Sequence, residues 1–345
     1  MNTESQNPED LPNAETEPVG VAREEILVAG NGNLSAEQIW KSPVWKPRRL
    51  WLAVLLFAVT FITCLVAGRQ FAVAFSNGQA ASLDEFTTSF RLIYKDPAAL
   101  APGFPFALAL MTILLAHELG HYFACKHHGI RASYPYFIPA PTLIGTLGAF
   151  ILMRSPIRTR RALFDVGASG PLAGFVVAIP VLLYGVAHSH IAAGLTSKDA
   201  DFIFGVPLAL RLAAHYFFPG TNPLTILLHP VARAAWVGLF ATSLNLLPAG
   251  QLDGGHILRS LSPRMHRWIG WLIPAILVAL WWIHQNTGIW LMWAGILVAL
   301  RFLRTPPVYD QRQLNFARMA LAAVALVVMI LCFIAVPFWQ TPSSD

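Results

Sequence analysis

Two histidines and a glutamate that could take part in metal chemistry lie within one short segment, His117-Glu118-Leu119-Gly120-His121. On a helix, His117 and His121 are four residues apart and share a face, so both imidazoles can reach one metal ion. Glu118 follows the first histidine and can reach a water molecule held by that ion. The spacing therefore predicts a metal site with a carboxylate placed to act as a general base.

This HExxH pattern is typical of zinc proteases, but it is short enough to arise by chance in a soluble protein. Here it lies near the end of an apolar run, Phe104–Cys125, that is long enough to cross a bilayer. Ionisable groups are costly in hydrocarbon, and where they occur they are functional by default. The context therefore favours a metal site over an incidental match.

A catalytic zinc ion usually has three protein ligands and a fourth position for water. The candidate third ligand is Asp253, in the motif N-x-x-P…LDG that runs from Asn245 to Gly254. Pro248 and the glycines near Asp253 predict an irregular backbone that could turn the carboxylate into a cavity, whereas a helix cap is the alternative role. The apolar run that precedes this motif is predicted to cross the membrane in the same direction as the run that contains HExxH. The two motifs should therefore lie at the same membrane depth. We therefore predict one Zn²⁺ per chain, bound by His117, His121 and Asp253.

The two motifs on separate spans resemble the site-2 protease family of intramembrane zinc metalloproteases. The resemblance covers about Phe104 to Pro307 and is nearest to the plastid and cyanobacterial branch named for a gravitropism-deficient, yellow-green plant phenotype. Further segments that carry it are Pro135–Ala149, Gly170-Pro171-Leu172-Ala173-Gly174 and His229-Pro230. It implies a zinc-dependent metalloendopeptidase that hydrolyses peptide bonds of membrane proteins within or near the bilayer. The residue roles that it implies are zinc ligands for His117, His121 and Asp253, catalytic base for Glu118, and substrate binding or oxyanion stabilisation for Asn245.

The elements that position these residues are predicted to be transmembrane helices. Hydrophobic residues make up 55% of the 345 residues and charged residues only 12%, about half the charged fraction of a soluble domain. A helix needs about 20 apolar residues to span the hydrocarbon. We therefore expect an all-α polytopic membrane protein with about seven transmembrane helices. The predicted spans are Leu50–Ala67, Phe104–Cys125, Ala168–Ala187, Pro230–Leu247, Trp268–His284, Gly288–Leu303 and Phe316–Trp339.

Two apolar stretches do not read as ordinary spans. Tyr134–Met153 contains three prolines and two glycines together with β-branched and aromatic residues. This composition breaks helices and favours extended chain, which predicts a re-entrant loop or β-hairpin near the active site. By the family resemblance, this segment would steer the substrate strand. The second stretch, Phe202–Phe218, is expected to form an interfacial helix with Arg211 and His215 on its wet face.

The distribution of basic residues predicts the orientation in the membrane. With a cytoplasmic N-terminus, 18 of the 24 Lys and Arg residues fall on the cytoplasmic side, as the positive-inside rule requires. The predicted location is a bacterial cytoplasmic membrane, with multiple passes and a C-terminus outside. The predicted domains are a disordered acidic tail (1–49), the first transmembrane helix with an outer loop (50–103), the metalloprotease core (104–307) and a C-terminal transmembrane helix (308–345).

The formal charge of +6 does not indicate a nucleic-acid partner, because the basic residues lie between apolar segments. The expected partners are the lipid bilayer and transmembrane protein substrates. Two other classes of protein remain as alternatives: a catalytically inactive protease-like scaffold, and an ion-conducting transporter that uses the intramembrane histidines and carboxylates. A transporter of this kind would typically contain an internal repeat, and none is visible. The sequence leaves three roles open for His256, three residues after Asp253: a hydrogen-bond donor to the site, a substrate contact, or no role.

Overall fold

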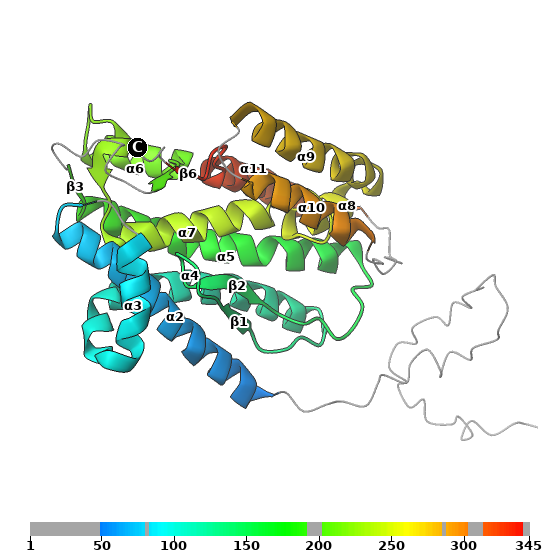
Figure 1. The fold of residues 1–345 in the computed structure, drawn as a ribbon. Helices are drawn as coiled ribbons and strands as arrows, with labels where there is room; N and C mark the ends of the chain where they lie inside the picture. Colours follow the sequence, from blue (N-terminus) through cyan, green and yellow to red (C-terminus); the bar gives the residue numbers. More distant parts are fainter. Residues whose placement is uncertain (1–48, 80–82, 192–201, 285–287, 303–312, 341–345) are drawn as a thin grey trace, which may run out of the picture. The chain divides into compact units, whose positions relative to one another are not determined.

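The computed structural model describes residues 49–79, 83–191, 202–284, 288–302 and 313–340 (Figure 1). Almost all of the predicted disordered tail lies outside these ranges. The described part is mostly helical, with three small two-stranded antiparallel sheets, β1–β2, β3–β5 and β4–β6. The bounds of β3, β5, β4 and β6 are His190–Ile191, Ile226–Leu227, Phe202–Phe204 and Phe338–Gln340.

Four segments in the described part are long and apolar enough to cross a membrane, which makes this a multi-pass membrane protein. They are α2 (Leu50–Ser76), the 3-10 helix η1 (Pro97–Gly103) joined to α4 (Phe104–His127), α5 (Arg160–Ala187) and α9 (Pro263–His284). Two shorter apolar helices are α10 (Ile289–Phe302) and α11 (Phe316–Cys332).

Helix α5 packs against three elements that carry the predicted site residues. These are α4, α7 (Pro230–Asn245) and the short helix α8 (Asp253–Leu261), and α5 can be followed between α4 and α7 in Figure 1. Gly167, Gly170 and Gly174 lie three and four residues apart on α5, and such spacing places small residues on one helix face, where neighbouring backbones can come close. This face is where α4 and α8 meet α5.

The segment Tyr134–Met153 forms a β-hairpin, as predicted. Its strands are β1 (Tyr136–Pro139) and β2 (Thr146–Phe150), paired antiparallel with an irregularity after Phe137. An isolated bridge between Ala132 and Met153 extends the pairing towards the base of the hairpin. Strand β1 packs on α2, and β2 contacts α4.

The predicted boundaries of two further helices were wrong. The helix expected over Phe202–Phe218 is only α6, Leu208–Phe217, because Gly205 and Pro207 separate it from strand β4. Arg211 and His215 are both exposed on α6. The last predicted span ends early, at Cys332, and the chain beyond it reaches Pro337 and then β6.

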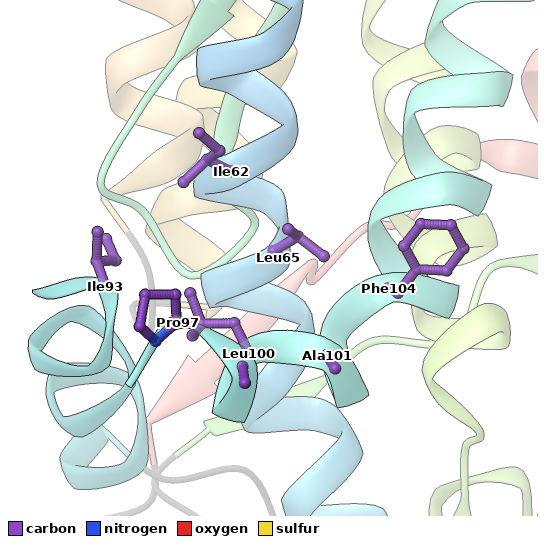
Figure 2. Close-up of a pocket in the computed structure, with 8 residues that line it drawn as sticks. Ile62, Leu65, Ile93, Pro97, Leu100, Ala101 and Phe104 are labelled. Carbon is purple, nitrogen blue, oxygen red and sulfur yellow. The ribbon is translucent and has the colours of Figure 1, made fainter. Parts of the chain in front are cut away.

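An apolar groove of about 660 Å³ lies between α2, the amphipathic helix α3 (Leu83–Lys95) and the junction of η1 with α4 (Figure 2). It shares no residue with the HExxH segment or with Asp253. The residues that line it are Ile62, Leu65, Ile93, Pro97, Ala98, Leu100, Ala101 and Phe104.

Candidate metal centre

The structure brings His117, His121 and Asp253 together, although Asp253 is more than 130 residues away along the chain. The two Nε2 atoms of the histidines are 3.1 Å apart. The Oδ2 atom of Asp253 lies 3.3 Å from each of them. Both histidine side chains are buried, and the carboxylate is 16% exposed. Among the described residues, this is the one group of three such side chains whose donor atoms converge closely enough to hold a metal ion.

The spacing of these three atoms fits a tetrahedral zinc site. Zinc binds nitrogen and carboxylate oxygen at roughly 2.0–2.2 Å, so two ligand atoms on a tetrahedron around it are about 3.3–3.6 Å apart. The observed separations of 3.1, 3.3 and 3.3 Å are close to this edge length. Two imidazoles and one carboxylate also match the ligand types of catalytic zinc sites, which leave a fourth position for water.

Backbone packing between α4 and α5 orients His121. Its Nδ1 atom donates to the carbonyl oxygen of Val166 at 2.7 Å, so the proton is on Nδ1 and the lone pair of Nε2 points towards Asp253. This approach requires glycine on α5. A Cβ atom at Gly170 would lie 2.1 Å from the His121 Nε2 atom, and one at Gly174 would lie 3.1 Å from the His117 Cβ atom. The GPLAG segment therefore creates the space that the histidines occupy.

Glu118 and Asn245 border the three ligand atoms. Glu118 is 5% exposed and interacts electrostatically with both histidines and with Asp253. Asn245 lies at the end of α7, and its Nδ2 atom is 3.3 Å from the His117 Nε2 atom. The structure thus places both residues next to the candidate metal site.

The backbone around Asp253 differs in part from the prediction. Gly250 has a left-handed backbone, with φ of +58°, in the turn before α8. The expected irregular backbone does not extend to Gly254 and Gly255, which lie inside α8. They are required for packing, because a Cβ atom on Gly254 would lie 2.0 Å from the Leu246 carbonyl oxygen.

Asp253 is in the first turn of α8, and the N-cap residue is Leu252. The carboxylate therefore faces the histidines rather than capping the helix. Burial raises the pKa of the Asp253 carboxyl, but His121 and His117 outweigh this effect and hold that pKa below its usual range. The carboxylate is therefore ionised at neutral pH, as a metal ligand must be.

His256 lies one turn further along α8 and packs against α5. A Cβ atom on Gly167 would be 2.8 Å from its Cβ atom. Burial lowers the pKa of His256 to about 4, so the imidazole is neutral at pH 7. It is not one of the three grouped ligands.

Sequence reasoning missed two contacts that hold these elements together. Arg160, at the start of α5, donates to the carbonyl oxygens of Ser260 and Leu261 at 2.8 and 2.7 Å, and so caps the C-terminus of α8. Asp165 on α5 accepts from Arg318 of α11 at 2.6 and 2.8 Å and is 2.8 Å from the His128 Nε2 atom. The only indication of these contacts in the sequence was a single acidic residue that follows several arginines.

Comparison with known proteins identifies the family. A model of peptidase family M50 matches residues 105–270, a range that contains the HExxH segment of α4, the glycines of α5 and Asp253. No solved structure gives a significant match.

Several curated plant proteins are similar to this chain. The probable zinc metalloprotease EGY1, chloroplastic, of Oryza sativa subsp. japonica is 29% identical over 233 residues, covering 62% of this chain and 38% of that protein. EGY1 of Arabidopsis thaliana is 26% identical over 319 residues, covering 87% and 56%. EGY2 of Arabidopsis thaliana is 34% identical over 167 residues, covering 47% and 29%.

The chain thus spans less than two thirds of the length of each of these relatives. The matched region nevertheless includes both motifs and the glycine segment that the structure brings together. The family model, these relatives and the candidate metal centre agree with the resemblance seen in the sequence, and the chain belongs to peptidase family M50, the site-2 protease family of zinc metalloproteases.

Proposed function

We propose that this protein is an intramembrane zinc metalloendopeptidase that cuts membrane-protein substrates within or near the bilayer. The observation that carries the proposal is the convergence of His117, His121 and Asp253 beside the buried carboxylate of Glu118. This group lies where helix α4, an apolar candidate span, and the short helix α8 both pack against α5. Such a set of groups is costly to bury, and it matches the requirements of metal-assisted peptide hydrolysis.

In this proposal, one zinc ion per chain is held by His117, His121 and Asp253. Bound zinc supplies Lewis-acid activation of water and of the scissile carbonyl. Glu118 takes a proton from the attacking water as its oxygen bonds to the carbonyl carbon, and then gives that proton to the leaving amide nitrogen as the C–N bond breaks. The Asn245 amide donates a hydrogen bond to the carbonyl oxygen, which gains negative charge during attack.

The β1–β2 hairpin is the proposed guide for the substrate. A helical substrate must unwind before its carbonyl groups are accessible, and an extended strand can pair with a strand edge. Leu147 and Phe150 of β2 are 69% and 40% exposed. They offer apolar contacts to a substrate strand beside β2.

The membrane arrangement is part of the same proposal. We propose about seven spans, with α7, α10 and α11 completing the set, a cytoplasmic N-terminus and the domain division at residues 49, 103 and 307. The proposed location is a bacterial cytoplasmic membrane, although the plant relatives are named as chloroplastic. The proposed partners are transmembrane protein substrates and the lipids around the helices.

The test is Glu118→Gln in purified full-length protein, assayed with a single-span membrane substrate in liposomes. The amide keeps the size of the side chain but cannot accept the proton. We expect cleavage to fall by roughly 10²–10⁴-fold, while zinc content and thermal stability stay close to those of the wild type. A chelator should abolish wild-type cleavage in parallel.

Three results would contradict the proposal. Normal cleavage by the glutamine variant would remove Glu118 as the base. Absence of cleavage by the zinc-loaded wild type against membrane substrates would favour an inactive scaffold. Flux of ions through wild-type liposomes, unaffected by the substitution, would favour a transporter.

A further inference from the structure

Helix α2 carries two polar side chains that face the turn of the β1–β2 hairpin. The hydroxyl of Thr63 donates to the carbonyl oxygen of Gly145 at 2.6 Å. The Nε2 atom of Gln70 donates to the carbonyl oxygen of Leu143 at 2.9 Å. Gln70 is only 1% exposed, although α2 is an apolar candidate span. Because Thr63 and Gln70 are seven residues apart, they lie two turns apart on one face of α2.

These contacts satisfy backbone carbonyl groups of the hairpin turn, of which the Gly145 oxygen also accepts from the Ala140 N–H at 3.3 Å. Leu143, Ile144 and Gly145 are consecutive, and the Cys64 Sγ atom lies 3.8 Å from the carbonyl oxygen of Ile144 between the other two contacts. Irregular backbone inside a membrane is tolerated only where protein or water satisfies its polar groups. Helix α2 provides that satisfaction for three carbonyl groups in a row.

The turn approaches α2 too closely for a side chain at Gly145. Its φ is +82°, and a Cβ atom there would lie 2.6 Å from the Cys64 Cα atom and 2.6 Å from the Thr63 carbonyl oxygen. Along β1, the rings of Phe57 and Phe137 meet edge to face at 5.1 Å. An isolated two-stranded hairpin is marginally stable at best, so its position depends on this docking.

We propose that Thr63 and Gln70 are positioning residues that anchor the hairpin turn to α2 and thereby set where β2 presents its edge to a substrate strand. This inference rests on the proposed proteolytic function. Neither residue lies at the metal centre. Loss of the anchor should therefore weaken substrate binding without removing zinc or changing the chemical step.

The experiment compares Gln70→Met and Thr63→Val with a matched control, Thr60→Val. Thr60 lies on the same helix with its side chain fully buried, and its Oγ1 atom has no hydrogen-bond partner among the described residues. The measurements on the full-length protein are hydrogen exchange of the amides in residues 140–146, zinc content, and kcat and KM for a single-span substrate.

We expect Gln70→Met and Thr63→Val to speed exchange in the turn and to raise KM by about tenfold, the scale of one lost hydrogen bond. Their kcat and zinc content should stay near wild-type values. Thr60→Val should match the wild type in every measurement. Thr63→Ser keeps the hydroxyl and should restore the wild-type exchange rate and KM.

Several outcomes decide the matter. Unchanged exchange in the turn in both variants, or a fall in kcat with an unchanged KM, would overturn the proposal. If Gln70→Met fails to fold, the pair Thr63→Val and Thr63→Ser decides it. If the wild type cleaves nothing while Gln70→Met still loosens the turn, the anchor is supported and the proposed proteolytic function is overturned.

Discussion

At the scale of single residues, the candidate metal centre depends on how His121 is held. The carbonyl oxygen of Val166 accepts a hydrogen bond from the Nδ1 atom, and the opposite nitrogen is thereby fixed towards Asp253. Gly170 leaves the space that this ring fills. A ligand that is fixed in tautomer and orientation before binding loses little freedom when an ion arrives.

Asp253→Ala should lower zinc affinity by more than roughly 100-fold, because even partners outside the ligand set typically contribute 10–100-fold. The measurement is metal content per chain after dialysis against a graded chelator series. Asp96→Ala is the matched control, since Asp96 is an exposed aspartate far from the site in the sequence. Equal zinc retention in the two variants would exclude Asp253 as a ligand.

At the scale of elements, the N-terminal part of α5 joins three other helices. Arg160 caps α8, which carries Asp253, and Asp165 joins α5 to His128 at the end of α4 and to Arg318 of α11. The Asp165 and Arg318 side chains are 22% and 21% exposed, so the pair is partly shielded from solvent. Helix α11 lies outside the region matched by the family model, and this ion pair ties it to the core.

Arg318→Ala should reduce the free energy of unfolding by about 1–3 kcal/mol, the usual cost of removing a partly buried charged hydrogen-bond partner. Asp165→Asn should cost a similar amount, and the double variant should cost less than the sum, because both changes break one interaction. Thermal unfolding in one detergent at fixed salt measures all three variants. Strict additivity would show that the pair contributes no coupling energy.

The element boundaries show what sequence could and could not predict here. The apolar runs, the HExxH motif and the proline-rich hairpin were all visible, because hydrocarbon imposes strong constraints on composition. The start of α5 was not predicted, because Arg160, Arg161 and Asp165 interrupt the apolar pattern there, whereas in the structure this segment packs against α4, α8 and α11. The anchoring of Leu143 and Gly145 to α2 was equally hidden, because it depends on packing between distant segments.

At the scale of the whole molecule, charge and helix direction define the expected topology. Arginines gather near the metal centre, where Arg154 and Arg158 lie between the hairpin and α5, and Arg160 and Arg161 begin α5. The positive-inside rule predicts that this region lies on the cytoplasmic side. The metal centre would then lie within reach of cytoplasmic water.

Reporter fusions after Trp40 and after Ser343 should report opposite sides, with the N-terminal fusion in the cytoplasm. The physical reason is the charge bias, combined with an odd number of spans. A third fusion in the loop between α2 and α4 should report the outer side and serves as an internal control. Identical reports from both ends would mean an even number of spans, and α10 and α11 would be the first segments to re-examine.

The close approach of α5 to His121 has a consequence for how the gene can change. Any single-base change that alters a glycine codon to another amino acid introduces a side chain with a Cβ atom. At Gly170 that atom would lie 2.1 Å from the His121 Nε2 atom, so no amino-acid replacement one base away leaves the ring in place. We therefore expect saturation mutagenesis to find this codon intolerant to every missense change, whereas the codon for Gly295 on α10, where a Cβ atom would meet no neighbour within 4 Å, should accept some of them.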